Sequence, residues 1–196
     1  MRSLCNPAAG RARGWLIVGM RIPTTTPAQA AEMIRRDQQL LLGRVAGKSD
    51  DELRAPYDVI AGPLGDFCES LHDLVAHVLM WDEINLAVLR DAKVRRLHWS
   101  LDPRWETPEI GSALNSGGVD AGRRIPSELV LHRFRSVGDA LVAEIEQYDE
   151  ESWADPSTGG GFDGGIGALA EYVSTTPDGV LFAHAARHLQ PRPVSA

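Results

Sequence analysis

Two histidines near the C-terminus, His184 and His188, have a spacing that indicates metal chemistry. Four residues apart on a helix, they project from one face with Cβ atoms about 5 to 6 Å apart, so both imidazoles can reach one ion. A third ligand must come from another element, and His77 is the best candidate because it lies among apolar residues of a strongly helical segment. Facing helices commonly assemble metal sites in this way. The spacing therefore predicts a metal site formed by His77, His184 and His188.

Solvated histidines are the competing interpretation of this pair. Positive charge near a helix C-terminus suits the helix dipole, so His184 and His188 have a plausible place in solvent. By itself, His77 also fits a core histidine bonded to a backbone carbonyl. Leu181 and Ala185 lie on the same helix face as the pair, which favours an inward orientation.

Two long helices are predicted in the N-terminal half of the chain. Thr26 followed by Pro27 is a typical helix start and predicts a helix over 27–46. Ser70, with an aspartate three residues later, predicts a second helix over 70–93 that contains no proline or glycine. The histidine candidate of this second helix lies in its buried stripe, where a polar group needs a partner.

The C-terminal half is predicted to supply two more helices. Residues 94–126 contain several Pro- and Gly-rich breaks and predict a long connection with one short helix. A third helix is predicted over 127–148. A final helix, capped by Thr175 or Thr176, is predicted to run to about Leu189. The fold class predicted is all-α, a four-helix bundle with a long connection between its second and third helices.

Length and composition fit one globular domain. The chain has 196 residues, of which 43% are hydrophobic and 24% charged, and we place the domain over residues 27–190. Residues 1–26 are predicted to be a flexible extension and 191–196 a short tail. The apolar run 15–20 is too short for a signal-peptide core or a membrane span.

Charge and cysteine content exclude several functional classes. A net charge of −7 disfavours nucleic acid and anionic membranes as partners, because both attract basic surfaces. The two cysteines, Cys5 and Cys68, form no CxxC pair, so neither a disulfide scaffold nor a cysteine zinc site is indicated. We therefore expect a cytoplasmic protein that acts on a small molecule and, as helical bundles often do, forms a homodimer.

The segment SLHDLVAHVLMWDEINL resembles the histidine-bearing helix of the DinB-like superfamily, whose pattern xxDLxxHxxxWxxx is matched at His77 and Trp81. In that superfamily the last helix supplies H-x3-H or E-x3-H, which His184 and His188 match. The runs WETPEIGSALN and ExxxYDEESW, the latter ending at Trp153, are similar to the ClbS/DfsB-like branch. The resemblance covers roughly residues 27–190 and supports the metal interpretation.

The resemblance also implies reaction classes. The superfamily includes transferases that use low-molecular-weight thiols such as mycothiol, and this implies transfer of a thiol to a small electrophile in detoxification. Hydrolysis of a reactive small molecule, as in the ClbS/DfsB-like branch, is the alternative enzyme. The related mycothiol-dependent maleylpyruvate isomerases carry an additional C-terminal domain, whereas this sequence stops soon after its last predicted helix, so we expect a different reaction. A non-enzymatic dimeric binding or stress protein is the remaining alternative.

The metal would be a divalent transition ion. Imidazole ligands suit zinc, nickel or iron, and three of them leave a coordination position open for water or substrate, as in catalytic sites. Asp82 and Glu83 are candidates for acid–base or supporting roles, although we favour solvent exposure for both.

The remaining polar and aromatic residues are assigned mainly structural roles. His72 should point away from the metal, and Cys68 should be a small buried hydrophobe. Trp99 and Trp105 either cover the cavity or pack as core. Arg123 and Arg124 either bind an anion or lie in solvent, and a glycine-rich stretch over 159–167 is expected to be flexible.

Overall fold

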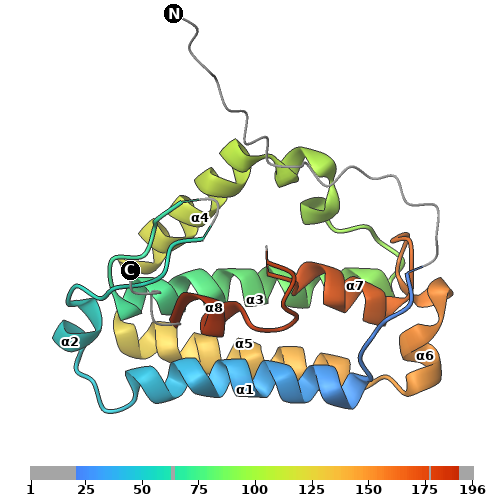
Figure 1. The fold of residues 1–196 in the computed structure, drawn as a ribbon, viewed down its shortest axis with the longest axis horizontal. Helices are drawn as coiled ribbons and strands as arrows, with labels where there is room; N and C mark the ends of the chain where they lie inside the picture. The colour runs from blue at the N-terminus through green and yellow to red at the C-terminus, as the bar shows by residue number, and fades with distance from the viewer. Residues whose placement is uncertain (1–20, 63–64, 177, 190–196) are drawn as a thin grey trace, which may run out of the picture.

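The computed structural model describes residues 21–62, 65–176 and 178–189, which form helices and turns with no β-strand among them (Figure 1). The all-α class predicted from the sequence is therefore confirmed. The predicted tail and residues 1–20 of the predicted extension lie outside the described residues. None of the described helices is long and apolar enough to cross a membrane.

Three long helices, α1 (Pro27–Val45), α3 (Leu71–Lys93) and α5 (Ser127–Ile145), lie side by side and enclose most of the core (Figure 1). Thr26 begins α1 with a capping box, in which its side chain accepts the Gln29 N–H and the Gln29 side chain accepts the Thr26 N–H. The side chain of Ser70 similarly accepts the N–H three residues on. These local signals explain why the sequence predicts α1 and α3 to within a few residues. The predicted helix over 127–148 also agrees with α5, which begins without a side-chain cap.

The final helix predicted from the sequence is wrong in its extent. Only its C-terminal part is helical, as α8 (His184–Leu189), and it is preceded by α7 (Ile166–Val173), a helix that the sequence analysis did not predict (Figure 1). The N–H of Thr176 donates to Val180 O at 2.9 Å and closes a turn instead of starting a helix. Gly179 and Phe182 follow with left-handed φ values of 87° and 50°, so the chain cannot be helical before His184.

The long connection predicted over 94–126 is more regular than expected. It contains α4 (Pro108–Gly122), a helix of 15 residues that rises away from α3 in Figure 1. Two 3-10 turns precede it, η1 (Trp99–Leu101) and η2 (Pro103–Glu106). Thr107 caps α4 and a proline occupies its first position. This is a typical helix start, but in the sequence it lies among other proline and glycine residues that indicate a loop.

Short elements cover the two ends of the molecule. The helix α2 (Asp50–Arg54) lies at one end and α6 (Glu150–Ala154) at the other, followed by the 3-10 turn η3 (Pro156–Thr158). Within the predicted extension, the N–H groups of Thr24 and Thr25 both donate to the Glu171 carboxylate on α7 at 2.7 Å.

The glycine-rich stretch packs closely against its neighbours, which corrects the expected flexibility. Gly160 has a φ of 62°, and a Cβ there would lie 2.5 Å from Cα of Ala92. A Cβ on Gly167 would lie 2.5 Å from Nε1 of Trp153, a fully buried side chain. The glycines therefore allow backbone and ring to approach at distances that no larger residue permits.

Candidate metal centre

The three predicted ligands converge inside the fold. His77 on α3 faces His184 and His188 on α8, and one ligand atom from each residue lies within 4.8 Å of the others. Nε2 of His77 and Nε2 of His184 are 3.0 Å apart. Two nitrogens bound to one zinc ion lie roughly 3 to 3.5 Å apart, because each Zn–N bond is about 2.0 to 2.1 Å. The observed separation is therefore close to that of a metal site.

The position of α8 depends on Asp37, a residue of α1 that the sequence did not single out. Its two carboxylate oxygens accept the backbone N–H groups of Ala185 and Ala186, each at 2.8 Å. These N–H groups belong to the first turn of a six-residue helix and have no intrahelical acceptor. Asp37 thereby fixes the helix that carries two of the three histidines.

The orientation of His188 is set by a backbone carbonyl. Its Nδ1–H donates to Ile60 O at 2.6 Å, and the N–H of Ile60 donates to His188 O at 3.0 Å. An imidazole that donates through Nδ1 carries no proton on Nε2 when it is neutral. This hydrogen bond is the kind of outer contact that orients a metal-bound histidine.

Electrostatics keep the imidazoles neutral and available as ligands. Burial lowers the pKa of His77 to about 3, with the neighbouring His188 adding a smaller effect. Burial also lowers the pKa of His184, followed by effects of the other two histidines, and lowers that of His188. Nδ1 of His77 is buried without a hydrogen-bond partner among the described residues. Its ring therefore makes polar contact with the described residues through Nε2 alone, which lies within hydrogen-bond distance of His184 Nε2, and a bond from this nitrogen to a metal ion would offset its burial.

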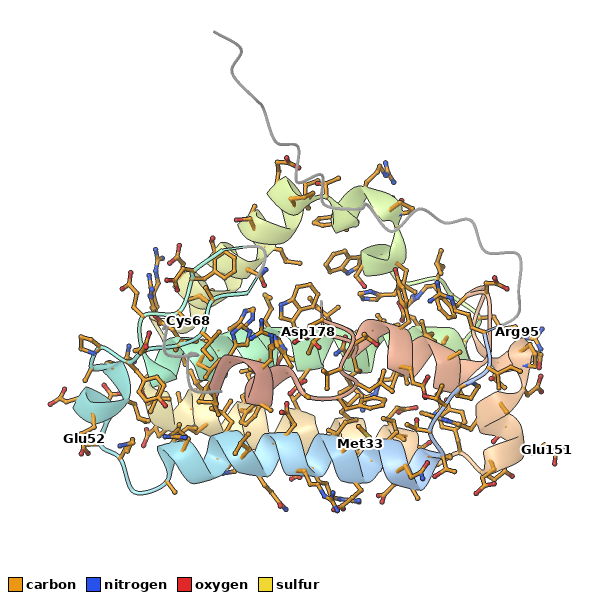
Figure 2. All side chains as sticks on the ribbon, in the orientation of Figure 1. Met33, Glu52, Cys68, Arg95, Glu151 and Asp178 are labelled. Carbon is orange, nitrogen blue, oxygen red and sulfur yellow. The ribbon has the colours of Figure 1, made fainter. Side chains whose placement is uncertain are left out.

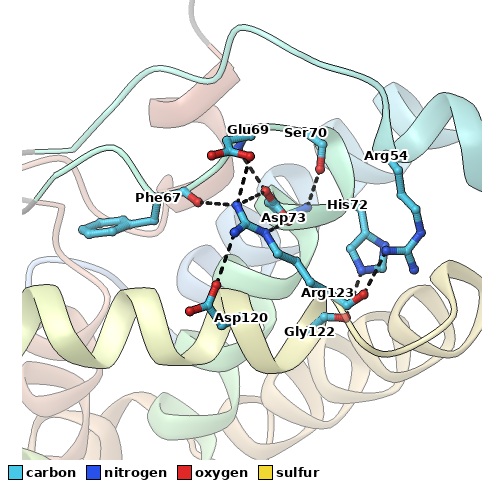
Figure 3. Close-up of polar contacts among 9 residues, drawn as sticks. All are labelled: Arg54, Phe67, Glu69, Ser70, His72, Asp73, Asp120, Gly122 and Arg123. Atoms are coloured by element: carbon cyan, nitrogen blue, oxygen red, sulfur yellow. Dashed lines mark hydrogen bonds and ion pairs between the residues drawn. The ribbon is translucent and has the colours of Figure 1, made fainter.

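Ion pairs and hydrogen bonds of Arg123 hold the segment that contains Phe67 (Figure 3). The Arg123 guanidinium binds the Asp73 carboxylate through Nε–Oδ1 at 3.0 Å and Nη2–Oδ2 at 2.8 Å, and Nη2 also donates to Phe67 O at 3.3 Å. The Phe67 ring centroid lies 6.3 Å from that of His77. Arg123 thus fixes the wall of the site, which differs from both the anion-binding and the solvated roles considered for it.

A cavity of about 630 Å³ opens beside the histidines. Its apolar walls come from several elements and include Ile34, Val78, Phe134, Leu141 and Phe182. Figure 2 shows Asp178, another lining residue, between α7 and α8 near the middle of the molecule. A mostly apolar pocket with a few polar groups is typical of small-molecule sites.

Asp82 and Glu83 have different environments, although the sequence suggested solvent for both. Asp82 lines the cavity. Glu83 instead pairs on the surface with Arg133, through Oε2 and Nη2 at 2.8 Å. The solvent-facing prediction is therefore wrong for Asp82. The helical spacing could have indicated this position of Asp82. Trp81 and Asn85 both line the cavity, and Asp82, which lies three residues before Asn85, belongs to the same side of the helix.

The other singled-out residues lie outside the site. His72 is a satisfied core histidine, with Nδ1 2.8 Å from Ser127 Oγ and Nε2 3.0 Å from Gly122 O. Cys68 is buried, and burial raises its pKa to about 12, as expected of an unreactive thiol. Trp99 and Trp105 contact each other at 4.6 Å between centroids, and neither lines the cavity.

Comparison with known proteins supports the fold but does not indicate which reaction the site performs. No protein-family model and no curated protein sequence matches the chain. A crystal structure of an uncharacterised protein from Escherichia coli UTI89 is similar, with a TM-score of 0.59 and 16% sequence identity. The alignment covers 86% of this chain and 91% of that protein. The arrangement of helices therefore occurs in another solved protein.

Proposed function

We propose that this chain is a metal-dependent enzyme of the DinB-like four-helix-bundle type, which transfers a low-molecular-weight, mycothiol-like thiol to a small electrophile in detoxification. The observation that carries the proposal is the convergence of His77, His184 and His188 beside a large apolar cavity. Three imidazoles leave room for a further ligand, which is typical of catalytic rather than structural metal sites.

The chain's own residues supply positioning and exclusion of water. Asp37 and the Ile60 carbonyl hold two ligands in place, and the lowered pKa values of the three histidines keep the rings neutral, the form that binds a metal ion, at neutral pH. A divalent zinc, nickel or iron ion held there would activate a bound thiol as its thiolate, or a bound water. The apolar walls would hold the electrophile next to that nucleophile and limit competing hydrolysis.

Hydrolysis of a reactive small molecule is the second candidate. Asp82 lines the same cavity as the histidines, and a carboxyl group there could exchange a proton with a water nucleophile. We also expect a cytoplasmic location and a homodimer, and light scattering of the purified protein would test the dimer.

Metal analysis of protein purified without a histidine tag tests the proposal. We expect one transition-metal ion per chain, lost in His184→Ala and retained in His132→Ala, which removes an exposed histidine of α5. Consumption of chlorodinitrobenzene faster than its uncatalysed reaction with the added thiol, in which the thiolate displaces chloride, should then require the metal. Consumption of a reactive ester without thiol would favour the hydrolase, and absence of bound metal would support a non-enzymatic binding protein.

A further inference from the structure

The cavity beside the histidines carries more acidic than basic groups. Asp37, Asp82 and Asp178 line it, whereas Arg187 is the only lysine or arginine among the described residues that line it. That guanidinium is already paired, because Nε of Arg187 lies 3.0 Å from Asp178 Oδ2. Asp37 is also engaged, since both of its oxygens accept N–H groups of α8. Of the three carboxyl groups, that of Asp82 differs from the other two.

Asp82 forms no hydrogen bond or ion pair with any residue that the structure describes, while lining a largely apolar cavity. Burial, together with the smaller effects of the nearby carboxylates of Asp37 and Glu83, raises its pKa to about 8. A partly buried carboxyl group in this state either retains a proton or takes a cation from outside the protein. Such a group costs folding free energy, so its presence in a binding cavity indicates a ligand-directed role.

The surroundings of Asp82 favour an organic cation over an inorganic one. Ile34, Phe134 and Leu141 offer apolar contact within the same cavity, and they would exclude a hydrated ion while accommodating a hydrocarbon body. The Trp81 indole adds an aromatic surface, held by its Nε1–H donating to Asn115 Oδ1 at 2.8 Å. Aromatic surface next to a carboxylate is well suited to an ammonium group with an apolar body.

We propose that the cavity selects small molecules that carry an ammonium group on an apolar body, and that Asp82 is the residue that binds this ammonium group. The inference rests on the proposed function in that the same cavity would hold the substrate. The ammonium end would lie at Asp82, while the other part of the molecule is directed towards the three histidines. Binding therefore requires only the cavity and not the metal.

Three probes of matched size test this specificity. 3-Phenylpropylamine is a cation, 3-phenylpropan-1-ol is neutral and 3-phenylpropionate is an anion at pH 8. Each is titrated into the metal-free protein and into the zinc-loaded protein, with the indole N–H signal of Trp81 as the NMR reporter inside the cavity. We expect the amine to bind about tenfold more tightly than the alcohol, and the acid more weakly than both.

Variants of neighbouring residues assign the preference to one side chain. Asp82→Asn, which keeps the shape of the side chain, should bind amine and alcohol equally, and Asp82→Glu should retain the preference. Glu83→Gln is the matched control, because that carboxylate pairs with Arg133 on the surface, and the variant should retain the preference for the amine. Equal binding of amine and alcohol by the unmodified protein would overturn the inference, as would an amine preference that survives in Asp82→Asn.

The outcome is separable from that of the metal experiment. An amine preference in a protein that binds no metal would leave the cavity inference intact and remove the proposed enzyme. A metal-binding protein without amine preference would leave the enzyme intact and remove the assignment of its substrate class.

Discussion

The carboxylate of Asp37 on α1 accepts the backbone N–H of Ala185 on α8 at 2.8 Å. This bond joins two elements that lie far apart in the sequence and fixes the turn between His184 and His188. The candidate metal centre is therefore anchored by α1 as well as by the two helices that carry its ligands.

Replacing this anchor should weaken metal binding without removing a ligand. In Asp37→Asn, the amide group presents an N–H to one of the two backbone N–H groups of α8, so α8 should shift. Loss of such supporting contacts typically lowers metal affinity by about 10- to 100-fold. Competition with a chromophoric chelator would measure the change.

The control for this variant lies on the same helix. Glu32→Gln removes a carboxylate of α1 that pairs with exposed Arg36 at 2.7 Å, away from α8. It should leave metal affinity unchanged, and an unchanged affinity in Asp37→Asn as well would show that α8 is held by other contacts.

Acid should destabilise the metal-free protein through its buried histidines. The pKa of His77 is lowered to about 3 and that of His184 is also lowered, whereas an unfolded histidine titrates near 6.5. Below about pH 6.5 the unfolded state therefore binds more protons than the folded state. The free energy of unfolding should fall by up to about 1.4 kcal/mol per pH unit for each histidine that stays neutral in the fold.

Urea unfolding of chelator-treated protein between pH 7.5 and 5 would measure this dependence. Asp82 has an opposite effect in the same range, so the informative quantity is the difference between the unmodified protein and His184→Ala. The variant should lose stability less steeply on acidification. Parallel curves would mean that His184 is already solvated or charged in the folded state.

The sequence predicts those elements whose determinants are local. Thr26 and Ser70 begin α1 and α3 through hydrogen bonds to residues three positions on, and such spacing is readable in a single chain. The start of α8 was missed because its capping carboxylate comes from Asp37, about 150 residues away. Convergence of the histidines followed from helical spacing and from resemblance to a family, whereas the contact of Ile60 with His188 had no local signal.

A glycine-rich sequence is compatible with a flexible linker and also with close packing of the backbone. The stretch that contains Gly160 and Gly167 has the composition of a flexible linker. In the structure, these positions lie against Ala92 and against the Trp153 indole, where a Cβ would not fit. Composition indicates that glycine is present, but only the neighbours determine whether it provides freedom or close packing.

Asp82→Asn should stabilise the fold at neutral pH. The folded-state pKa of about 8 exceeds the value of 3.8 for an unpaired aspartate, so the folded state binds more protons between these values. Stability contributed by this group is thus present at low pH and lost as pH rises through that window. Removing the ionisable group should raise the free energy of unfolding at pH 7.5 by about 1 to 3 kcal/mol.

Chemical denaturation of both proteins at pH 5 and pH 7.5 would check the sign. The gain in the free energy of unfolding should be larger at the higher pH. At that pH the unfolded state releases the proton of this carboxyl group readily, whereas the folded state must either keep the proton or hold the charge in the cavity. A loss of stability in Asp82→Asn at pH 7.5 would mean that the carboxyl group has a stabilising contact in the protein.

Two glycines of α4 should respond in opposite directions to the same substitution. A Cβ on Gly122 would lie 2.4 Å from Cβ of Ala76, so Gly122→Ala has to push α4 away from α3 and should cost about 1 to 3 kcal/mol. A Cβ on Gly117 meets nothing within 4 Å, so Gly117→Ala should stabilise the helix by up to about 1 kcal/mol. Thermal unfolding of both variants would measure the two changes in stability.

Because Asn115 of α4 holds the Trp81 indole at the cavity wall, Gly122→Ala should also shift the Trp81 N–H resonance, while Gly117→Ala should leave it in place. Equal effects of the two substitutions would show that α4 does not pack against α3 at the closeness described.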